Sequence, residues 1–178
     1  MIQTIQIGHL LREAVAAPYR NLVTRPTGAA VRSRIEQALA RANGLTALLD
    51  FSDIELVDLS CADEVVAKLL LAGTTAYFVV LQGLREDHHE AIDHVLMHHR
   101  LAVAAVPPHS QRPRLLGWVR PDAREAFGCV SGRGPLCVAD LARDLGWPET
   151  RGLNALRDLA FHRLIRPIGE LYYPLLPA

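Results

Sequence analysis

The sequence lacks the features that mark a disulfide-bonded, zinc-bound or membrane-spanning protein. Its 178 residues include only three cysteines, which are widely spaced and form no Cys-x-x-Cys pair. This argues against a disulfide framework and a zinc ribbon and predicts reduced thiols, so we expect a cytoplasmic protein. The longest apolar run, near residues 65–81, is interrupted by Lys68, Gly73 and Thr74. No basic segment followed by a long apolar stretch lies near Met1, so we expect neither a signal peptide nor a membrane partner.

The sequence also lacks an excess of charge of either sign. Lysine plus arginine and aspartate plus glutamate each total 19, and Lys68 is the only lysine. Residues 1–110 hold 9 basic and 12 acidic side chains, whereas residues 111–178 hold 10 basic and 7 acidic ones. The C-terminal part therefore carries a net positive charge. This excess of positive charge is small for a protein that binds nucleic acid.

Half of the residues are hydrophobic, which is enough for a sizeable core in one large domain or two small ones. Strand-like and helix-like segments alternate over the first 106 residues. Strands are expected at residues 2–7, 45–51, 76–83 and 101–106. Helices with one apolar face are expected at residues 27–44, 60–73 and 86–100. This alternation predicts an α/β fold over residues 1–106, with a largely parallel sheet and flanking helices.

The pattern changes after this α/β segment. Residues 107–113 contain three prolines and are expected to form a linker. Three helices are expected next, at residues 121–130, 136–146 and 148–165, and then two short strands within 163–175. Three helices followed by a hairpin are typical of the winged-helix variant of the helix-turn-helix. The stretches "LCVADLARDLGWP" and "RGLNALRDLAFHRLIRPIGELYYPL" resemble winged-helix domains of bacterial regulators, so we expect a small second domain at residues 114–178.

A serine at the start of a predicted helix is the first candidate functional residue. In "VDLSCADE", residues 57–64, Ser60 is followed three positions later by Asp63, which is the spacing of a capping box. In that interpretation the hydroxyl only accepts a hydrogen bond from a helix amide. The same position also suits a phosphate, because the free amides and the positive end of the helix dipole would meet it. Both interpretations remain open at this point.

The same stretch resembles the STAS domain, the family of anti-sigma-factor antagonists. In that family a strand and an Asp-containing loop lead to Asp-Ser-Ser-Gly at a helix start, and the second serine is phosphorylated to switch partner binding. Asp58 matches the motif aspartate and Ser60 matches the acceptor serine, whereas Leu59 replaces the first serine and Cys61 replaces the glycine. The resemblance covers roughly residues 1–106.

The resemblance implies that Ser60 is a candidate phosphoacceptor and that its surroundings bind a regulatory protein. The implied partner surface consists of Asp58, Ser60, Asp63, Glu64 and Lys68. A different possibility is an enzyme in which Ser60 or Cys61 acts as the nucleophile together with a histidine. The G-x-S-x-G elbow of a serine hydrolase is absent. We therefore expect no catalysis and no cofactor.

Five of the eight histidines lie in the predicted helix at residues 86–100. Three pairs have the four-residue spacing that places side chains on one helix face: His89–Asp93, Glu90–His94 and His94–His98. Imidazole and carboxylate groups placed in this way can bind a transition metal. The H-E-x-x-H order is absent, and apolar residues such as Ile92 already define a buried face. A solvated histidine face without metal is therefore the prediction.

The last predicted helix supplies candidate contacts to nucleic acid. Leu153, Leu156 and Leu159 have helical spacing and should pack inward. Arginine and asparagine can read guanine and adenine edges, and arginine also binds phosphate. The candidate residues are Thr150, Arg151, Asn154 and Arg157 on the helix, with Arg163 and Arg166 beside the wing. Glu149 and Asp158 on the same helix would oppose phosphates.

Together these patterns predict a bacterial-type regulatory protein in which a STAS-like domain is coupled to a winged-helix output domain. Double-stranded DNA is one candidate partner of the winged helix. The alternative is a protein-interaction adaptor or anti-sigma-factor antagonist whose winged helix docks a protein or forms a homodimer.

Overall fold

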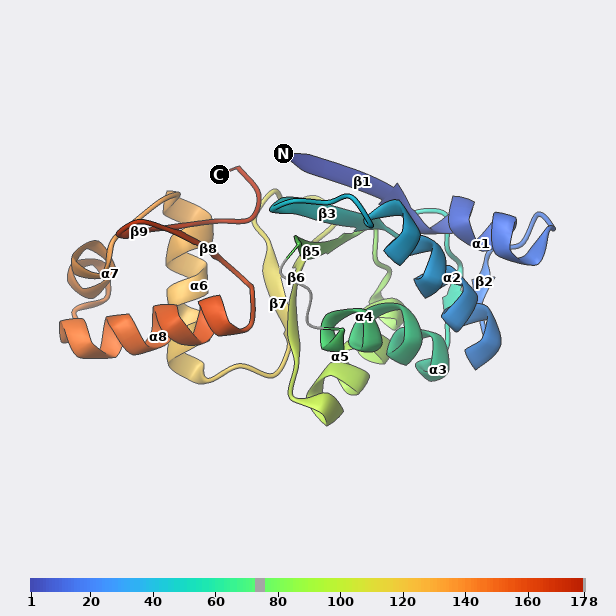
Figure 1. Cartoon of the computed structure of the whole chain (residues 1–178). Helices are drawn as coiled ribbons and strands as arrows, with labels where there is room; N and C mark the ends of the chain where they lie inside the picture. Colours follow the sequence, from blue (N-terminus) through green and yellow to red (C-terminus); the bar gives the residue numbers. More distant parts are fainter. Residues whose placement is uncertain (73–75, 178) are drawn as a thin grey trace.

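The computed structural model describes residues 1–72 and 76–177, and a five-stranded sheet lies at its centre (Figure 1). In spatial order its strands are β1 (Ile2–Gln6), β3 (Leu45–Asp50), β5 (Tyr77–Gln82), β6 (Ala102–Val106) and β7 (Arg114–Gly117). The first four strands are parallel to one another, and β7 is antiparallel to β6. The predicted α/β class with a largely parallel sheet is confirmed, and β1 lies at one edge of the sheet.

Helices cover one face of this sheet. They are α1 (Ile7–Val15), α2 (Arg25–Ala38), α3 (Leu59–Ala62), the π-helical segment η1 (Asp63–Ala67), α4 (Lys68–Leu71) and α5 (Glu86–His99). A short parallel pair joins β2 (Asn21–Leu22) to β4 (Leu56–Val57). Successive parallel strands follow one another in the same direction across the sheet, so right-handed crossovers place the connecting helices on one side. Leu49, Leu81 and Ile92 are among the fully buried side chains of this layer.

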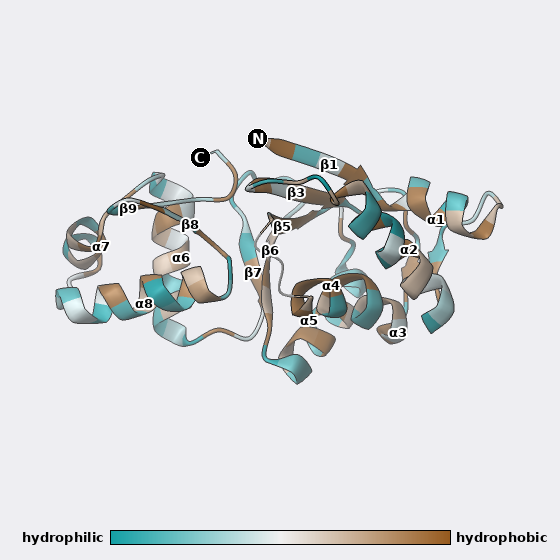
Figure 2. Ribbon diagram, viewed as in Figure 1, coloured by the Kyte–Doolittle hydropathy of each residue, from teal (hydrophilic) through white to brown (hydrophobic). Residues whose placement is uncertain are grey.

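The C-terminal residues cover the other face. They form α6 (Pro121–Arg133), α7 (Val138–Leu145), α8 (Glu149–Phe161) and the antiparallel pair β8 (Arg166–Ile168) and β9 (Leu171–Tyr173). Val80, Ala102 and Ala104 of the sheet belong to the same buried cluster as Phe127 and Val130 of α6. Because both faces are covered at β5 and β6, these strands are mainly hydrophobic along their length (Figure 2). None of the helices within residues 1–72 and 76–177 has the length and apolar composition needed to cross a bilayer.

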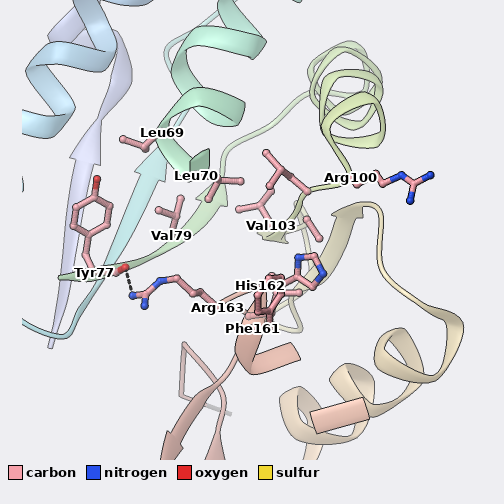
Figure 3. A pocket seen from close by; sticks show the side chains of 12 residues that line it. Leu69, Leu70, Tyr77, Val79, Arg100, Val103, Phe161, His162 and Arg163 are labelled. Carbon is pink, nitrogen blue, oxygen red and sulfur yellow. Dashed lines mark hydrogen bonds between the residues drawn. The ribbon is translucent and has the colours of Figure 1, made fainter. Parts of the chain in front are cut away.

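Polar contacts also hold the C-terminal residues to the sheet. Thr46 Oγ1 donates a hydrogen bond to the carbonyl of Leu175 at 3.0 Å, and this bond is buried. Arg163 Nη2 donates to the carbonyl of Tyr77 at 2.5 Å (Figure 3), and Arg166 Nη2 donates to Thr46 Oγ1 at 3.2 Å. The C-terminal residues therefore share both a core and a polar seam with the sheet.

Two segments differ from the sequence prediction. Residues 114–117, expected in the C-terminal domain, form β7 and pair with β6, so residues 107–113 connect two neighbouring strands. Residues 7–15 form α1, a helix that was not predicted although Ile7, Leu10, Leu11 and Ala14 have helical spacing. The stop predicted at Gly73 lies outside the described residues.

Candidate functional site

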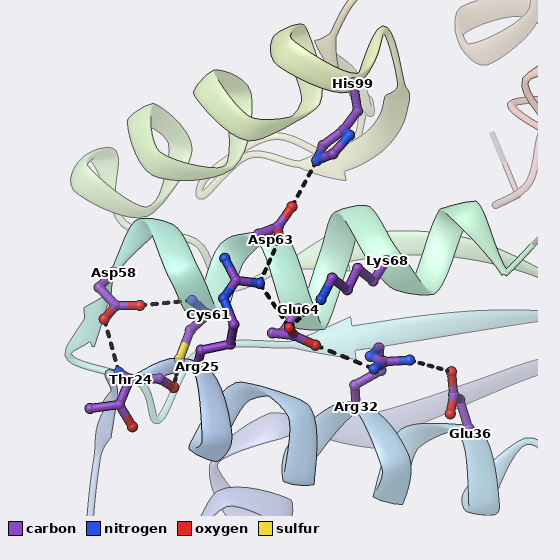
Figure 4. Close-up of polar contacts among 10 residues, drawn as sticks. All are labelled: Thr24, Arg25, Arg32, Glu36, Asp58, Cys61, Asp63, Glu64, Lys68 and His99. Carbon is purple, nitrogen blue, oxygen red and sulfur yellow. Dashed lines mark hydrogen bonds and ion pairs between the residues drawn. The ribbon is translucent and has the colours of Figure 1, made fainter.

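Helix α3 begins at a polar corner built around Asp58 (Figure 4). Asp58 is the N-cap: its Oδ1 accepts hydrogen bonds from the Cys61 amide at 2.7 Å and from Ser60 Oγ at 2.8 Å. Its Oδ2 accepts from the Thr24 amide at 2.9 Å. The capping box predicted from Ser60 and Asp63 is therefore wrong, because the helix begins before Ser60 and Asp58 supplies the cap.

This corner favours a charged Asp58 and a neutral Cys61. Burial opposes ionisation of Asp58, but hydrogen bonds from the Cys61 and Thr24 amides and the Ser60 hydroxyl outweigh it and hold its pKa below the ordinary value. Burial, and next the charge of Asp58, raise the pKa of Cys61 to about 12. The Cys61 Sγ donates to the carbonyl of Thr24 at 3.1 Å. The thiol thus stays protonated at neutral pH, which makes it a poor nucleophile.

A buried carboxylate follows the corner in η1. The Glu64 side chain is 3% exposed and contacts three cations: Arg25 Nη1 at 2.8 Å, Arg32 Nη2 at 3.3 Å and Lys68 Nζ at 2.5 Å (Figure 4). Burial opposes its ionisation, but hydrogen bonds from Lys68 and Arg25 outweigh it and lower its pKa. Gly28 permits the close approach of α2, because a Cβ there would lie 3.0 Å from the Glu64 Cβ. Glu64 therefore ties α2 to the π-helical segment.

Asp63 connects this cluster to α5. Its Oδ2 accepts from Arg25 Nη1 at 2.7 Å, and its Oδ1 forms a hydrogen bond with His99 Nε2 at 2.8 Å. Burial opposes its ionisation, but the hydrogen bonds from Arg25 and His99 hold the pKa of Asp63 below the ordinary value. An open groove of about 540 Å³ lies beside these contacts. It is lined by Arg25, Leu59, Ser60, Asp63, His94, Val95, His98 and His99.

The structure gathers the residues of the implied partner surface but does not expose them equally. Glu64 is buried and paired with Arg25, Arg32 and Lys68, whereas Ser60 is half-buried and lines the groove. Asp58, Asp63 and Lys68 are also half-buried. Sequence reasoning missed Arg25 and His99, because they lie 38 and 36 positions from Asp63 and no local spacing indicates such pairs.

The histidine-rich helix α5 does not form a metal site among the residues that the structure describes, where no group of three or more potential ligands is suitably placed. His94 and His98 line the groove, and His89 lines a separate hollow. The prediction that the histidines face solvent is wrong for His88, which is fully buried. Its Nδ1 accepts from the Arg85 amide at 3.1 Å and its Nε2 lies 2.9 Å from the Glu55 carbonyl, so it caps the start of α5.

A second polar cluster lies at the carboxyl ends of the parallel strands, where ligands of α/β sheets often bind. Gln6, Asp50 and Gln82 are in register on β1, β3 and β5. Asp50 accepts hydrogen bonds from both glutamine side chains and from the amide and hydroxyl of Ser52. Its oxygens are therefore occupied by neighbours, and the cluster has a structural role.

The residues predicted to contact nucleic acid divide into two groups. Thr150, Arg151, Asn154 and Arg157 are exposed on α8. Arg151 makes a bidentate pair with Asp122 of α6, at 2.9 and 2.7 Å, and its guanidinium lies 4.1 Å from the Trp147 ring. The charge of Arg151 is therefore already neutralised, and Arg157 is the basic residue of this group that projects from the middle of α8.

Arg163 and Arg166 lie elsewhere, at the contact with the sheet. Both guanidinium groups lie 4.4 Å from the centre of the Phe78 ring on β5. Burial and the neighbouring charge of Arg166 lower the pKa of Arg163. These two arginines hold the C-terminal residues to the sheet, and they are not placed beside the exposed face of α8.

We compared the chain with protein-family models, with curated proteins and with solved structures, and found no match. Function is therefore inferred from the residues and their geometry.

Proposed function

We propose that the chain is a regulatory protein in which a STAS-like α/β domain binds a protein partner at the groove beside Ser60. The C-terminal residues form a winged-helix output unit packed on the opposite face of the sheet. The protein acts by binding and not by catalysis. The poor nucleophilicity of Cys61 supports this choice over the enzyme alternative.

The position of the Ser60 hydroxyl carries the proposal. The side chain lines an open groove and at the same time donates its hydrogen bond to Asp58, the cap of α3. Asp58 in turn holds the Thr24 amide at the start of α2. A change at Ser60 therefore acts directly on the contact between two helices.

A phosphate on Ser60 would be expected to rearrange this corner. It would lose the hydrogen bond to Asp58 and would repel the carboxylates of Asp58 and Asp63. Arg25, which now pairs with Asp63 and Glu64, is the nearby guanidinium that a phosphate would attract. Such an exchange of partners would alter the groove surface and hence the affinity for a protein partner.

The test compares capture of partners from the native cell by wild-type chain, Ser60→Asp and the control Ser33→Asp. Ser33 is exposed on α2, so the same charge is added away from the groove. We expect wild-type and Ser33→Asp to retain the same stoichiometric partner and Ser60→Asp to change its affinity about tenfold, with little change in melting temperature. Equal affinity for all three proteins would refute the proposal.

Duplex DNA is the second candidate partner, and the order of the C-terminal elements favours it. The β8–β9 pair follows the three helices, and Leu136, between α6 and α7, forms an isolated antiparallel bridge with Tyr172 of β9. This order resembles that of a winged helix. In that arrangement α8 is the helix that would enter the major groove, and it exposes Asn154 and Arg157.

Binding of the full chain to a random duplex at about 50 and 200 mM salt tests this candidate. We expect measurable binding at low salt that weakens steeply at high salt, and a several-fold loss in Arg157→Ala. Arg41→Ala changes an exposed arginine near the end of α2 and serves as the matched control. Absence of binding at low salt would favour a winged helix that docks a protein or forms a homodimer.

A further inference from the structure

The central sheet has an open edge at β1, its outermost strand (Figure 1). β1 pairs with β3 in unbroken register, and no other strand in the described part of the chain pairs with its far side. The Thr46 amide donates to the carbonyl of Met1, one residue before its register partner Ile2. Because backbone groups alternate in direction along a strand, those of Gln3 face β3, whereas the N–H and C=O groups of Ile2 and Thr4 point away from it.

Nothing in the described residues 1–72 and 76–177 forms a hydrogen bond with the outward backbone groups of Ile2 and Thr4. Thr4 is exposed, and Ile2 is 43% exposed. The sequence of β1, IQTIQ, contains no charged residue, proline or glycine, and its register with β3 has no bulge. β1 therefore lacks the usual features that prevent a sheet edge from pairing with another strand.

The opposite edge of the same sheet, at β7, is protected by side chains. Arg124 of α6 donates from Nη1 to the carbonyl of Leu115 and from Nη2 to the carbonyl of Gly117, both at 3.0 Å. The Gly117 amide donates to Asp93 Oδ1 of α5 at 2.7 Å. These side chains occupy the backbone groups through which another strand would pair with β7. Of the two edges of this sheet, β1 is therefore the open one.

We propose that the chain forms a homodimer in which β1 pairs antiparallel with β1 of a second copy, with Gln3 opposite Gln3 of the partner subunit. In this register Ile2 of each chain lies opposite Thr4 of the partner subunit. Their outward N–H and C=O groups then form a hydrogen-bonded pair on each side of the two-fold axis. The inference goes beyond the proposed regulatory function, because no residue that lines the Ser60 groove belongs to β1.

A second copy of the chain is the partner that fits this edge. Antiparallel pairing of identical strands is self-complementary, as a two-fold axis requires. Because the β7 edge is protected, each chain pairs only once, so the assembly closes as a dimer and does not continue as a fibre. β1 carries no charge that would repel its copy, and pairing would remove apolar surface of Ile2 from water.

Sedimentation velocity of the full chain at about 1–200 µM tests for the dimer, since a contact between two short strands should have a micromolar dissociation constant. We expect the average mass to rise from that of one chain toward that of two chains as the concentration increases. A chain that stays monomeric over this range would overturn the proposal, and β1 would then be an edge for an extended segment of another protein.

Charge exchanges at Gln3 test the register. Gln3→Glu or Gln3→Lys places two like charges opposite each other at the two-fold axis, so each variant alone should dimerise at least about tenfold more weakly than wild type. An equimolar mixture of the two variants should recover a mixed dimer, because unlike charges then face each other. The control Gln37→Glu, at an exposed position of α2, should dimerise as wild type does.

Two outcomes of this test contradict the proposal. Unchanged dimerisation of Gln3→Glu would place the interface elsewhere, for example at the winged helix, and would overturn the inference. Failure of the mixture to recover a dimer would overturn the register, since the loss in the single variants would then not come from charge repulsion.

Thr4→Pro tests the backbone pairing without adding charge. The Thr4 amide points away from β3, so proline removes a donor of the open edge and leaves the hydrogen bonds between β1 and β3 in place. We expect Thr4→Pro to weaken the dimer at least about tenfold, whereas the control Thr4→Ala keeps the N–H and should dimerise as wild type does. Equal dimerisation of Thr4→Pro and Thr4→Ala would overturn the proposal.

Discussion

At the scale of single residues, the cap of α3 is Asp58 and not Ser60. A serine at a helix start with an aspartate three positions later predicts a serine cap. In the structure Asp58 caps the helix, and the Ser60 hydroxyl donates to it. Ser60 therefore does not cap the helix, and its side chain lines the groove. For this reason it remains the candidate switch.

Substitution of the cap should cost more than substitution of the serine. Asp58→Ala removes the acceptor of two backbone amides, and we expect it to lower the free energy of unfolding by about 1–2 kcal/mol. Ser60→Ala removes only a donor to that carboxylate, so its cost should be smaller, below about 1 kcal/mol. Urea unfolding of both variants checks the order. A larger loss in Ser60→Ala would contradict the assignment of the cap.

Cys61 should be unreactive in the folded chain. Burial and the charge of Asp58 raise its pKa to about 12, so the thiolate population at pH 8 is very small. In a variant with Cys129→Ser and Cys137→Ser, we expect iodoacetamide to label Cys61 orders of magnitude faster in denaturant than in native buffer. Rapid labelling of the native variant at pH 8 would show that the thiol is accessible and ionised, and it would revive the enzyme alternative.

At the scale of elements, the buried carboxylate of Glu64 holds together segments that are distant in sequence. The π-helical segment η1 carries Glu64 and Asp63 side by side, and Arg25 of α2 contacts both. His99 extends the same network to α5. A π-helical turn within a helix is often found at functional sites, and here it lies next to the groove at Ser60.

Stability should depend on pH through these carboxylates. Asp58, Asp63 and Glu64 have pKa values below their ordinary ones in the folded chain, so their ionised forms stabilise the fold. That contribution is complete above the unfolded-state pKa values, near 4–4.5, and is lost as the pH falls through the lower folded-state values. We therefore expect the melting temperature to decrease steeply below about pH 4.5.

Glu64→Gln isolates the part of this effect that comes from Glu64. The amide keeps the size of the side chain but cannot compensate the three cations, and we expect a loss of about 1–3 kcal/mol at neutral pH. Below the folded-state pKa values the difference from wild type should shrink, because wild-type Glu64 is then also neutral. Glu36→Gln, an exchange in the partly exposed pair with Arg32, is the control. A difference that stays constant from pH 7 to acid would show that the charge of Glu64 is not responsible.

At the scale of the whole molecule, the sheet contributes side chains to two hydrophobic cores, one on each of its faces. Helices α1–α5 pack on one face, and α6, α8 and the C-terminal strands pack on the other. Val80 and Ala104 of the sheet are fully or almost fully buried, so removal of the C-terminal residues would expose apolar surface. The two predicted domains are consequently expected to be coupled in stability.

Unfolding should proceed as a single transition. Trp147 lies in the C-terminal part, and Trp118 follows β7, where its amide donates to the carbonyl of Leu101. Their fluorescence therefore reports on the C-terminal part and its junction with the sheet, whereas far-ultraviolet circular dichroism reports on all helices. We expect coincident urea midpoints for both signals, because neither core is complete alone. A fragment of residues 1–117 should aggregate or melt well below the full chain. Separate midpoints, together with a stable monomeric fragment, would show two independent domains.

Substitution of Phe78 tests the contact between the sheet and the C-terminal residues. Both Arg163 and Arg166 pack on its ring, so Phe78→Leu should lower the melting temperature while keeping an apolar side chain in the sheet. We expect a loss of about 1–2 kcal/mol from the two cation–π contacts and the changed shape. Phe161→Leu replaces an aromatic residue that is 83% exposed and should have little effect. Equal effects of the two exchanges would argue against the seam.

Local sequence patterns predicted the helices and strands but not which of them pack together. The apolar runs that form β3, β5 and β6, and the periodic segment that forms α5, were predicted to within a few residues. Burial on both sheet faces or on one helix face leaves a repeating apolar signal. The helix predicted at residues 27–44 was also found, but α2 already ends at Ala38. α1 was not predicted although its apolar residues have helical spacing, because it follows β1 directly and Ile7 was assigned to the strand. β7 escaped because its strand follows a proline-rich stretch that is typical of linkers.

The sequence by itself determined the alternation of strands and helices, the apolar core residues and the polar corner at residues 58–64, since each depends on neighbours along the chain. Only the tertiary structure decided that Arg25, Arg32 and His99 meet the acidic pair Asp63 and Glu64, and that Arg163 and Arg166 pack on the sheet. The physical reason is that an ion pair or a shared cavity depends on distance in space. Residues tens of positions apart reach that distance only when the helices and the C-terminal residues have packed on the sheet.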